Sequence, residues 1–147
     1  MLRTAIVTTV LIAALAEPLA VRAGGSGAAA QAPAQVTSAE AAPFLGEWIL
    51  ALQGERGPGT FNLAVKVEND KVVADLVTEA TPAQRITSIS KTAKSLLLSY
   101  SFPYDNMTVD ATITLTPGTD GKVAAQIDFA GGAYTMTGTA SKKEKAK

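Results

Sequence analysis

The sequence predicts an all-β domain that folds as an eight-stranded antiparallel up-and-down barrel. The first observation is the stretch from Met107 to Thr116, where apolar and polar residues alternate without a break. A two-residue period of this kind is typical of a strand with one buried and one solvated face. The second observation is that similar segments recur at intervals of roughly a dozen residues, with turn-forming residues in every gap. The third is that pairing the first strand with the last would leave no exposed sheet edge. A two-sheet β-sandwich is the alternative, although its Greek-key crossovers need longer connections.

Residues 1–23 have the features of a secretory signal peptide. Arg3 supplies a positive charge, and residues 5–16 are apolar except for two threonines. Small residues at 21–23 suit a cleavage site, with residues 14–16 as an earlier alternative. The apolar run is too short to span a membrane. Because the chain has no cysteine, we expect no lipid-anchored cysteine at the mature N-terminus. We therefore expect an exported protein, either periplasmic or secreted.

The remaining residues divide into a linker, a barrel domain and a tail. Residues 24–42 are nearly all Gly, Ala, Ser, Pro and Gln, which predicts a flexible linker. Bulky apolar residues first appear at Pro43 and Phe44, so the barrel domain is expected to occupy residues 43–141. The charged residues at 142–147 are expected to form a solvated tail.

Each of the eight expected strands has an apolar row that can face the barrel interior. The strands are expected at residues 47–53, 60–68, 71–78, 84–91, 95–102, 106–116, 122–129 and 133–140. Asn69 and Asp70 form a two-residue hairpin signal between the second and third strands. The fourth strand is irregular because Ile86 and Ile89 have opposite parity, so it needs a bulge or a partly polar inner face.

The outward positions of these strands carry charged side chains, which a membrane barrel would not place against lipid. These residues are Lys66, Glu68, Asp75, Asp110 and Asp128. We therefore predict a barrel that does not span a membrane.

Composition excludes several classes of function. Thirteen basic and thirteen acidic residues leave no net charge, so no nucleic-acid partner is expected. The absence of cysteine and histidine removes thiolate nucleophiles, the usual general base and the commonest metal ligands. We therefore expect a monomer that is not an enzyme, with no catalytic residues, no metal site and no cofactor.

The entry to the first strand resembles a known family. Phe44-Leu45-Gly46-Glu47-Trp48, at the start of an eight-stranded meander, is similar to the Gly-x-Trp signature of lipocalins, within the calycin group of ligand-binding barrels. The resemblance covers residues 43–141 and implies binding of a small apolar ligand. It also implies a basic residue near the end of the last strand that packs over the tryptophan, and Lys142 or Lys143 would serve. The family's helix after the barrel has no counterpart here.

The meander topology also predicts where a ligand would bind. Alternate turns lie at opposite ends of such a barrel, so the aromatic residues Phe61, Tyr100, Phe102, Tyr104, Phe129 and Tyr134 all approach one end. These rings either line the mouth of a ligand pocket, with Trp48 as its floor, or plug a filled core. The first case predicts a binding protein for a small apolar ligand. The second predicts an accessory module that binds an envelope or secreted protein.

Overall fold

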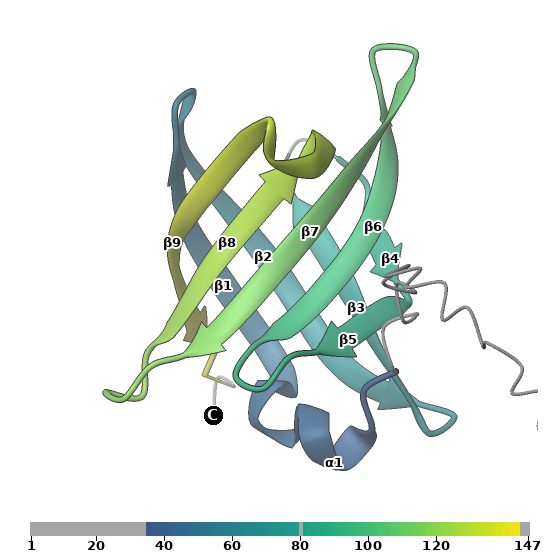
Figure 1. The fold of residues 1–147 in the computed structure, drawn as a ribbon, viewed down its shortest axis with the longest axis vertical. Coiled ribbons are helices and arrows are strands. Elements are labelled where there is room, and N and C mark those ends of the chain that lie inside the picture. Colours follow the sequence, from purple (N-terminus) through teal and green to yellow (C-terminus); the bar gives the residue numbers. More distant parts are fainter. Residues whose placement is uncertain (1–34, 80, 145–147) are drawn as a thin grey trace, which may run out of the picture. The chain divides into compact units, whose positions relative to one another are not determined.

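The computed structural model describes residues 35–79 and 81–144, and the expected signal peptide lies outside this part of the chain. The prediction of an all-β antiparallel barrel is confirmed (Figure 1). The described residues form one sheet of nine strands. The strands are β1 (Gly46–Gly54), β2 (Gly57–Glu68), β3 (Lys71–Thr78), β4 (Gln84–Ile86), β5 (Ser88–Lys91), β6 (Leu96–Tyr104), β7 (Met107–Pro117), β8 (Val123–Phe129) and β9 (Tyr134–Lys142). Three short helical turns accompany them: α1 (Ser38–Ala41), η1 (Ala42–Phe44) and η2 (Ala130–Gly132).

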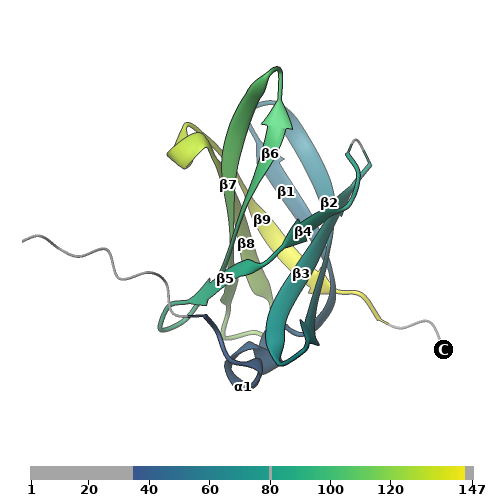
Figure 2. The ribbon, with the colours of Figure 1, turned by 90° about the vertical axis from the view of Figure 1, so that its right-hand side faces the viewer.

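The barrel closes in two different ways. The first strand pairs with the last, with Leu50 opposite Ala140, as an up-and-down barrel requires. The hydrogen-bonded order then runs from β4 through β1 and β9 to β5, so β4 and β5 are the two ends of the sheet. Only Thr87 separates these two strands in the chain, and Figure 2 shows them running obliquely from β3 across to β6. The gap in the nearly closed barrel between the two ends of the sheet, β4 and β5, is therefore bridged by the chain itself.

The irregular fourth strand of the sequence analysis is in fact two strands, which accounts for the count of nine instead of eight. Ile86 on β4 lies opposite Ala74 of β3, whereas Ile89 on β5 lies opposite Leu98 of β6. Both isoleucines are buried. Because β4 and β5 belong to opposite ends of the sheet, the two-residue period restarts between them and neither a polar inner face nor a bulge is needed.

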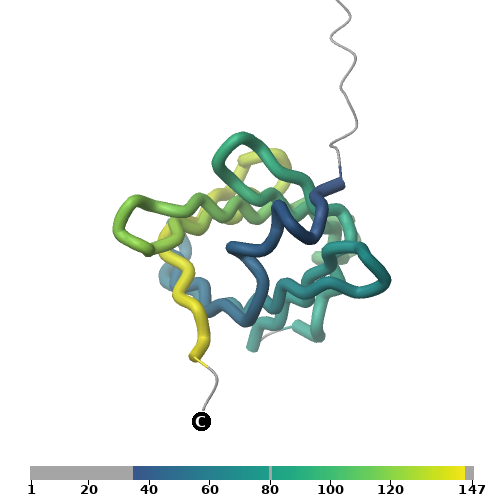
Figure 3. Tube along the Cα trace, turned by 90° about the horizontal axis from the view of Figure 1, so that it is seen from below, coloured from purple at the N-terminus to yellow at the C-terminus, as the bar shows by residue number. Residues whose placement is uncertain are grey.

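The folded structure begins earlier than the expected end of the linker at residue 42. Val36 and Ala41 are buried, and the α1 and η1 turns lie across one end of the ring of strands (Figure 3). Thr37 caps α1 through a capping box with Glu40, and the hydrogen bonds from the Thr37 backbone and side chain lower the pKa of Glu40. Composition misplaced the boundary because a small residue such as Ala41 can be fully buried without adding bulk.

The two-residue turn predicted at Asn69 and Asp70 is confirmed, and both residues have positive φ. The β6–β7 hairpin is tighter than expected, because Asp105 and Asn106 both have positive φ and match a two-residue type I′ turn, so its strands extend further. The β6–β7 hairpin therefore places Pro103 within β6 and not in the turn. Beyond Ser99, β6 is paired on one edge only, which is where a sheet tolerates proline.

The barrel interior is packed with apolar side chains at the α1 end. Nine large side chains are less than 2% exposed: Leu50, Leu63, Leu76, Ile86, Leu96, Leu98, Ile113, Leu115 and Ile127. Five of the predicted aromatic residues toward the other end are partly buried and pack against this core, namely Phe61, Tyr100, Phe102, Phe129 and Tyr134, whereas Tyr104 is exposed. Met107, the first residue of the alternating stretch, is 65% exposed because the β6–β7 hairpin extends beyond the barrel (Figure 1). The core is thus filled at one end and thins toward the other.

Charged side chains on the outer face connect β4 to its neighbours. Arg85 on β4 pairs with Glu68 of β2 and with Asp75 of β3, the latter at 3.3 Å. Lys66 Nζ lies 2.9 Å from Glu68 Oε1 and 2.8 Å from Asp75 Oδ2. The hydrogen bond from Arg85, followed by that from Lys66, lowers the pKa of Glu68. This network links β4 to β2 and β3 across the outer face of the sheet.

Within residues 35–79 and 81–144, the helices are all too short to cross a membrane.

Candidate ligand-binding cavity

A cavity of about 520 Å³ lies at the end of the barrel opposite α1. Phe61 and Leu76 line it from β2 and β3, and Tyr100 and Phe102 line it from β6. The local topology explains why a cavity forms here. Because β5 pairs with β6 only as far as Ser99, the upper part of β6 has no strand partner on the side that faces β3. Side chains at this level therefore border a gap in the wall.

A second cavity of about 250 Å³ adjoins the first at the mouth. Phe102, Tyr104 and Phe129 line both cavities, so their side chains form the boundary between the two. Tyr134, Val109 and Arg56 complete the smaller cavity. Together the two cavities hollow the end of the barrel where the core thins.

Four aromatic rings form a continuous series along the mouth. The ring centroids of Tyr100 and Phe102 are 5.9 Å apart and the rings are stacked. Phe102 meets Phe129 edge to face at 6.1 Å, and Phe129 lies 5.7 Å from Tyr134. These distances fall in the range where aromatic pairs attract each other. The four rings therefore form a row of mutual contacts, and each of them lines at least one of the two cavities.

The pKa of Tyr100 reflects its burial beside the larger cavity. Burial raises the pKa of its hydroxyl from 10.0 to about 12, because the phenolate is poorly solvated there. The hydroxyl therefore stays neutral at physiological pH and offers one hydrogen-bond donor and acceptor in a lining that also contains Glu79 and Gln84.

Alkaline titration monitored by tyrosine absorbance is expected to show one tyrosine that ionises near pH 12, and Tyr100→Phe should remove that step. The folded-state pKa exceeds the usual 10.0, so this group's contribution to stability is complete below pH 10 and is lost as the pH rises to about 12. The free energy of unfolding should therefore fall less steeply with pH in the variant over that interval. If Tyr100→Phe still shows an ionisation near pH 12, that ionisation belongs to another tyrosine.

Six of the seven residues predicted to bind a ligand line the two cavities. They are Phe61, Tyr100, Phe102, Tyr104, Phe129 and Tyr134. Trp48, the seventh, lines neither cavity, which corrects the prediction that it forms the floor. Trp48 is buried near the start of β1, beside η1. The larger cavity is instead lined by Leu76 at the level below the rings. The core residues between the two ends separate Trp48 from the mouth.

Trp48 instead anchors the closed end of the barrel. Its indole Nε1 donates a hydrogen bond of 2.7 Å to the Phe44 carbonyl oxygen, and Lys142 Nζ lies 5.6 Å from its ring centroid. A basic residue over the tryptophan is what the resemblance to lipocalins led us to expect. A Cβ at Gly46, where φ is +121°, would lie only 2.9 Å from Lys142 Cε. The glycine of the Gly-x-Trp stretch thus leaves room for the lysine to cross the ring.

Comparison of this chain with protein-family models, with curated proteins and with solved structures finds no match. Its function is therefore inferred from the cavity itself.

Sequence reasoning missed several residues of the mouth. Arg56 and Glu79 lie in connections, where no periodicity indicates which way a side chain points, and both border the cavities. Leu76 and Val109 were expected to face inward, but nothing in the alternation distinguishes a core position from a cavity wall. Strand register alone decides which inward residues reach the mouth.

A further cavity of about 330 Å³ lies near the closed end, beside Val36, Lys71 and Ile89. Polar side chains contribute much of its lining, and none of the predicted site residues borders it. In the described part of the chain no three acidic side chains are grouped so that they could hold a metal ion.

Proposed function

We propose that this protein is an exported, non-enzymatic binding protein that holds a small apolar ligand in the 520 Å³ cavity. The observation that carries the proposal is the combination of volume and lining. Ligand pockets usually measure about 300–1,000 Å³ and combine mostly apolar walls with a few polar groups. Here Phe61, Leu76, Phe102 and Phe129 supply the apolar surface, while the neutral Tyr100 hydroxyl supplies a polar contact.

The driving force for binding would be the removal of apolar surface from water on both partners. Each 50 Å² of such area contributes about 1.3 kcal/mol at roughly 25 cal/mol/Å². The packed core beneath the cavity supports the rings from below, so the site is largely preformed and little ordering energy is lost on binding. Export is part of the proposal because residues 1–23 have signal-peptide features.

Titration with the neutral fluorescent probe N-phenyl-1-naphthylamine tests this function. We expect saturable binding to the wild type and about tenfold weaker binding to Phe102→Ala, since that variant loses roughly 50 Å² of apolar contact. Because Phe102 lines a hollow, the same variant should lose only about 1 kcal/mol of stability. A ring that plugged a filled core would cost about 3–5 kcal/mol on truncation.

Ile49→Ala is the matched control, because Ile49 lies on the outer face of β1 and is 36% exposed. Its probe affinity should equal that of the wild type. No saturable binding to the wild type would refute the proposal. If native mass spectrometry of protein from its own host then found a bound protein and no small molecule, the accessory-module alternative would be favoured.

A further inference from the structure

We propose that the mouth of the barrel selects cationic amphiphiles, with a quaternary ammonium headgroup against the aromatic rings of the smaller cavity and an alkyl chain in the larger one. This inference rests on the proposed function, that the larger cavity holds an apolar ligand. Three independent features of the mouth support a positive headgroup: its rings, the cation that already lies on one of them, and the charges around it.

The smaller cavity is built mainly from aromatic side chains. Phe102, Tyr104, Phe129 and Tyr134 all line it, and only Val109 and Arg56 complete the lining. The face of an aromatic ring carries partial negative charge, so clustered rings attract a cation that sheds little water, such as a quaternary ammonium group. The shared walls of the two cavities allow one ligand to place its headgroup on the rings and its chain in the larger cavity.

Arg56 shows that the rings accept a cation. Its guanidinium carbon lies 5.4 Å from the Tyr134 ring centroid, within the range of a cation–π contact. Arg56 occupies the exposed two-residue turn between β1 and β2 and pairs with no carboxylate in the described part of the chain. A ligand cation could therefore displace this side chain into solvent at little cost.

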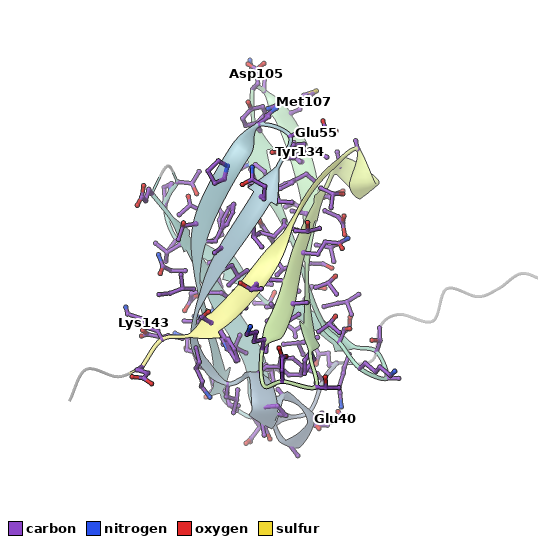
Figure 4. All side chains as sticks on the ribbon, turned by 90° about the vertical axis from the view of Figure 1, so that its left-hand side faces the viewer. Glu40, Glu55, Asp105, Met107, Tyr134 and Lys143 are labelled. Atoms are coloured by element: carbon purple, nitrogen blue, oxygen red, sulfur yellow. The ribbon has the colours of Figure 1, made fainter. Side chains whose placement is uncertain are left out.

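The charges at this end of the barrel favour a positive ligand. The four connections here contain three carboxylates, Glu55, Glu79 and Asp105, and a single basic residue, Arg56. Figure 4 shows Glu55, Asp105 and Tyr134 grouped at the mouth, far from Glu40 and Lys143. Glu79 lines the larger cavity itself. An anionic headgroup would meet like charge on most sides, whereas a cationic headgroup would be attracted.

Displacement of N-phenyl-1-naphthylamine from the wild type, at concentrations below micelle formation, tests the selectivity. The competitors are dodecyltrimethylammonium, dodecyl sulfate and neutral dodecyl maltoside, which share the same alkyl chain. We expect the cation to bind about tenfold more tightly than the sulfate, with the neutral compound between them. Added salt should reduce the difference in affinity between the ammonium compound and the sulfate, because salt screens exposed charges. The part of this difference that is due to the aromatic rings should remain.

Three variants separate the contributions. Tyr134→Leu keeps an apolar side chain but removes a ring face, so it should reduce the preference for the cation several-fold. Arg56→Ala removes the competing internal cation and should tighten binding of the ammonium compound. Glu79→Gln should weaken ammonium binding at low salt, whereas Glu144→Gln, which lies beyond the C-terminal end of β9, should leave it unchanged.

The outcomes distinguish this inference from the function on which it rests. Equal displacement by the cation and the sulfate, or tighter binding of the sulfate that Arg56→Ala abolishes, would overturn the selectivity while leaving an apolar binding protein intact. Failure of the neutral probe to bind the wild type at all would overturn the proposed function itself.

Discussion

Replacing Gly138 with alanine is expected to lower the free energy of unfolding by about 3 kcal/mol or more. A Cβ at this position would lie 2.0 Å from the Ala51 carbonyl oxygen and 3.0 Å from Leu52 Cα. Both atoms belong to the backbone of β1, so no side chain can rotate to relieve the overlap. The β1 and β9 strands would have to separate, and their pairing is what closes the first strand of the barrel on the last.

Urea denaturation followed by Trp48 fluorescence measures this effect, because Trp48 is buried on β1 near Lys142 of β9. Thr139→Ala is the control, since Thr139 is the exposed neighbour on the same strand and its truncation should change stability by less than about 0.5 kcal/mol. Equal denaturation midpoints for Gly138→Ala and the wild type would show that β1 and β9 can adjust to a side chain here.

Replacing Leu98 with alanine is the other substitution with a large expected effect, a loss of about 3–5 kcal/mol. Leu98 is fully buried on β6, with Ile89 and Ile113 opposite it on the neighbouring strands. Truncation removes apolar contacts and leaves a cavity in the filled part of the barrel, where close-packed neighbours cannot collapse completely. The same denaturation measurement applies.

Met107→Ala serves as the comparison, because Met107 also belongs to the apolar row of its strand but is 65% exposed on the β6–β7 hairpin. It should cost less than about 0.5 kcal/mol. Leu98 lines neither of the cavities at the mouth, so folded Leu98→Ala should bind N-phenyl-1-naphthylamine at the mouth with wild-type affinity. A small stability loss in Leu98→Ala would mean that the closed half of the barrel is loosely packed.

Part of the mouth could be predicted because the end of the barrel at which each turn lies depends on strand order. Hairpin connections alternate between the two ends of a meander, so residues near alternate turns must gather. Phe61, Phe102 and Phe129 belong to three different strands, yet all three were placed at one end in this way, and they line one cavity. Trp48 was assigned to the floor because strand order places it at the opposite end of the barrel, but strand order does not show how much packed core lies between the two ends.

Other features depend on contacts between segments far apart in the chain. The change of parity between Ile86 and Ile89 is visible in the sequence, but that Thr87 connects strands at opposite ends of the sheet follows only from their pairing. The composition of residues 24–42 predicts that Ala41 belongs to a linker. Its burial beneath the strands arises because the capped turn of α1 covers one end of the barrel.

The sequence by itself determined the all-β class, the closure of the first strand on the last and the end at which the aromatic rings meet. The class and the end at which the rings meet follow from the two-residue period of a strand and from the turns between strands, both of which are local properties. The closure follows from the need to leave no exposed sheet edge. Only the tertiary structure decided whether those rings fill the core or surround a cavity. That outcome depends on register and depth: beyond Ser99, β6 is paired with β7 alone, and Leu76 of the core lines the cavity. Neither the register nor the depth of the core is encoded in any single segment, because each results from how several strands pack together.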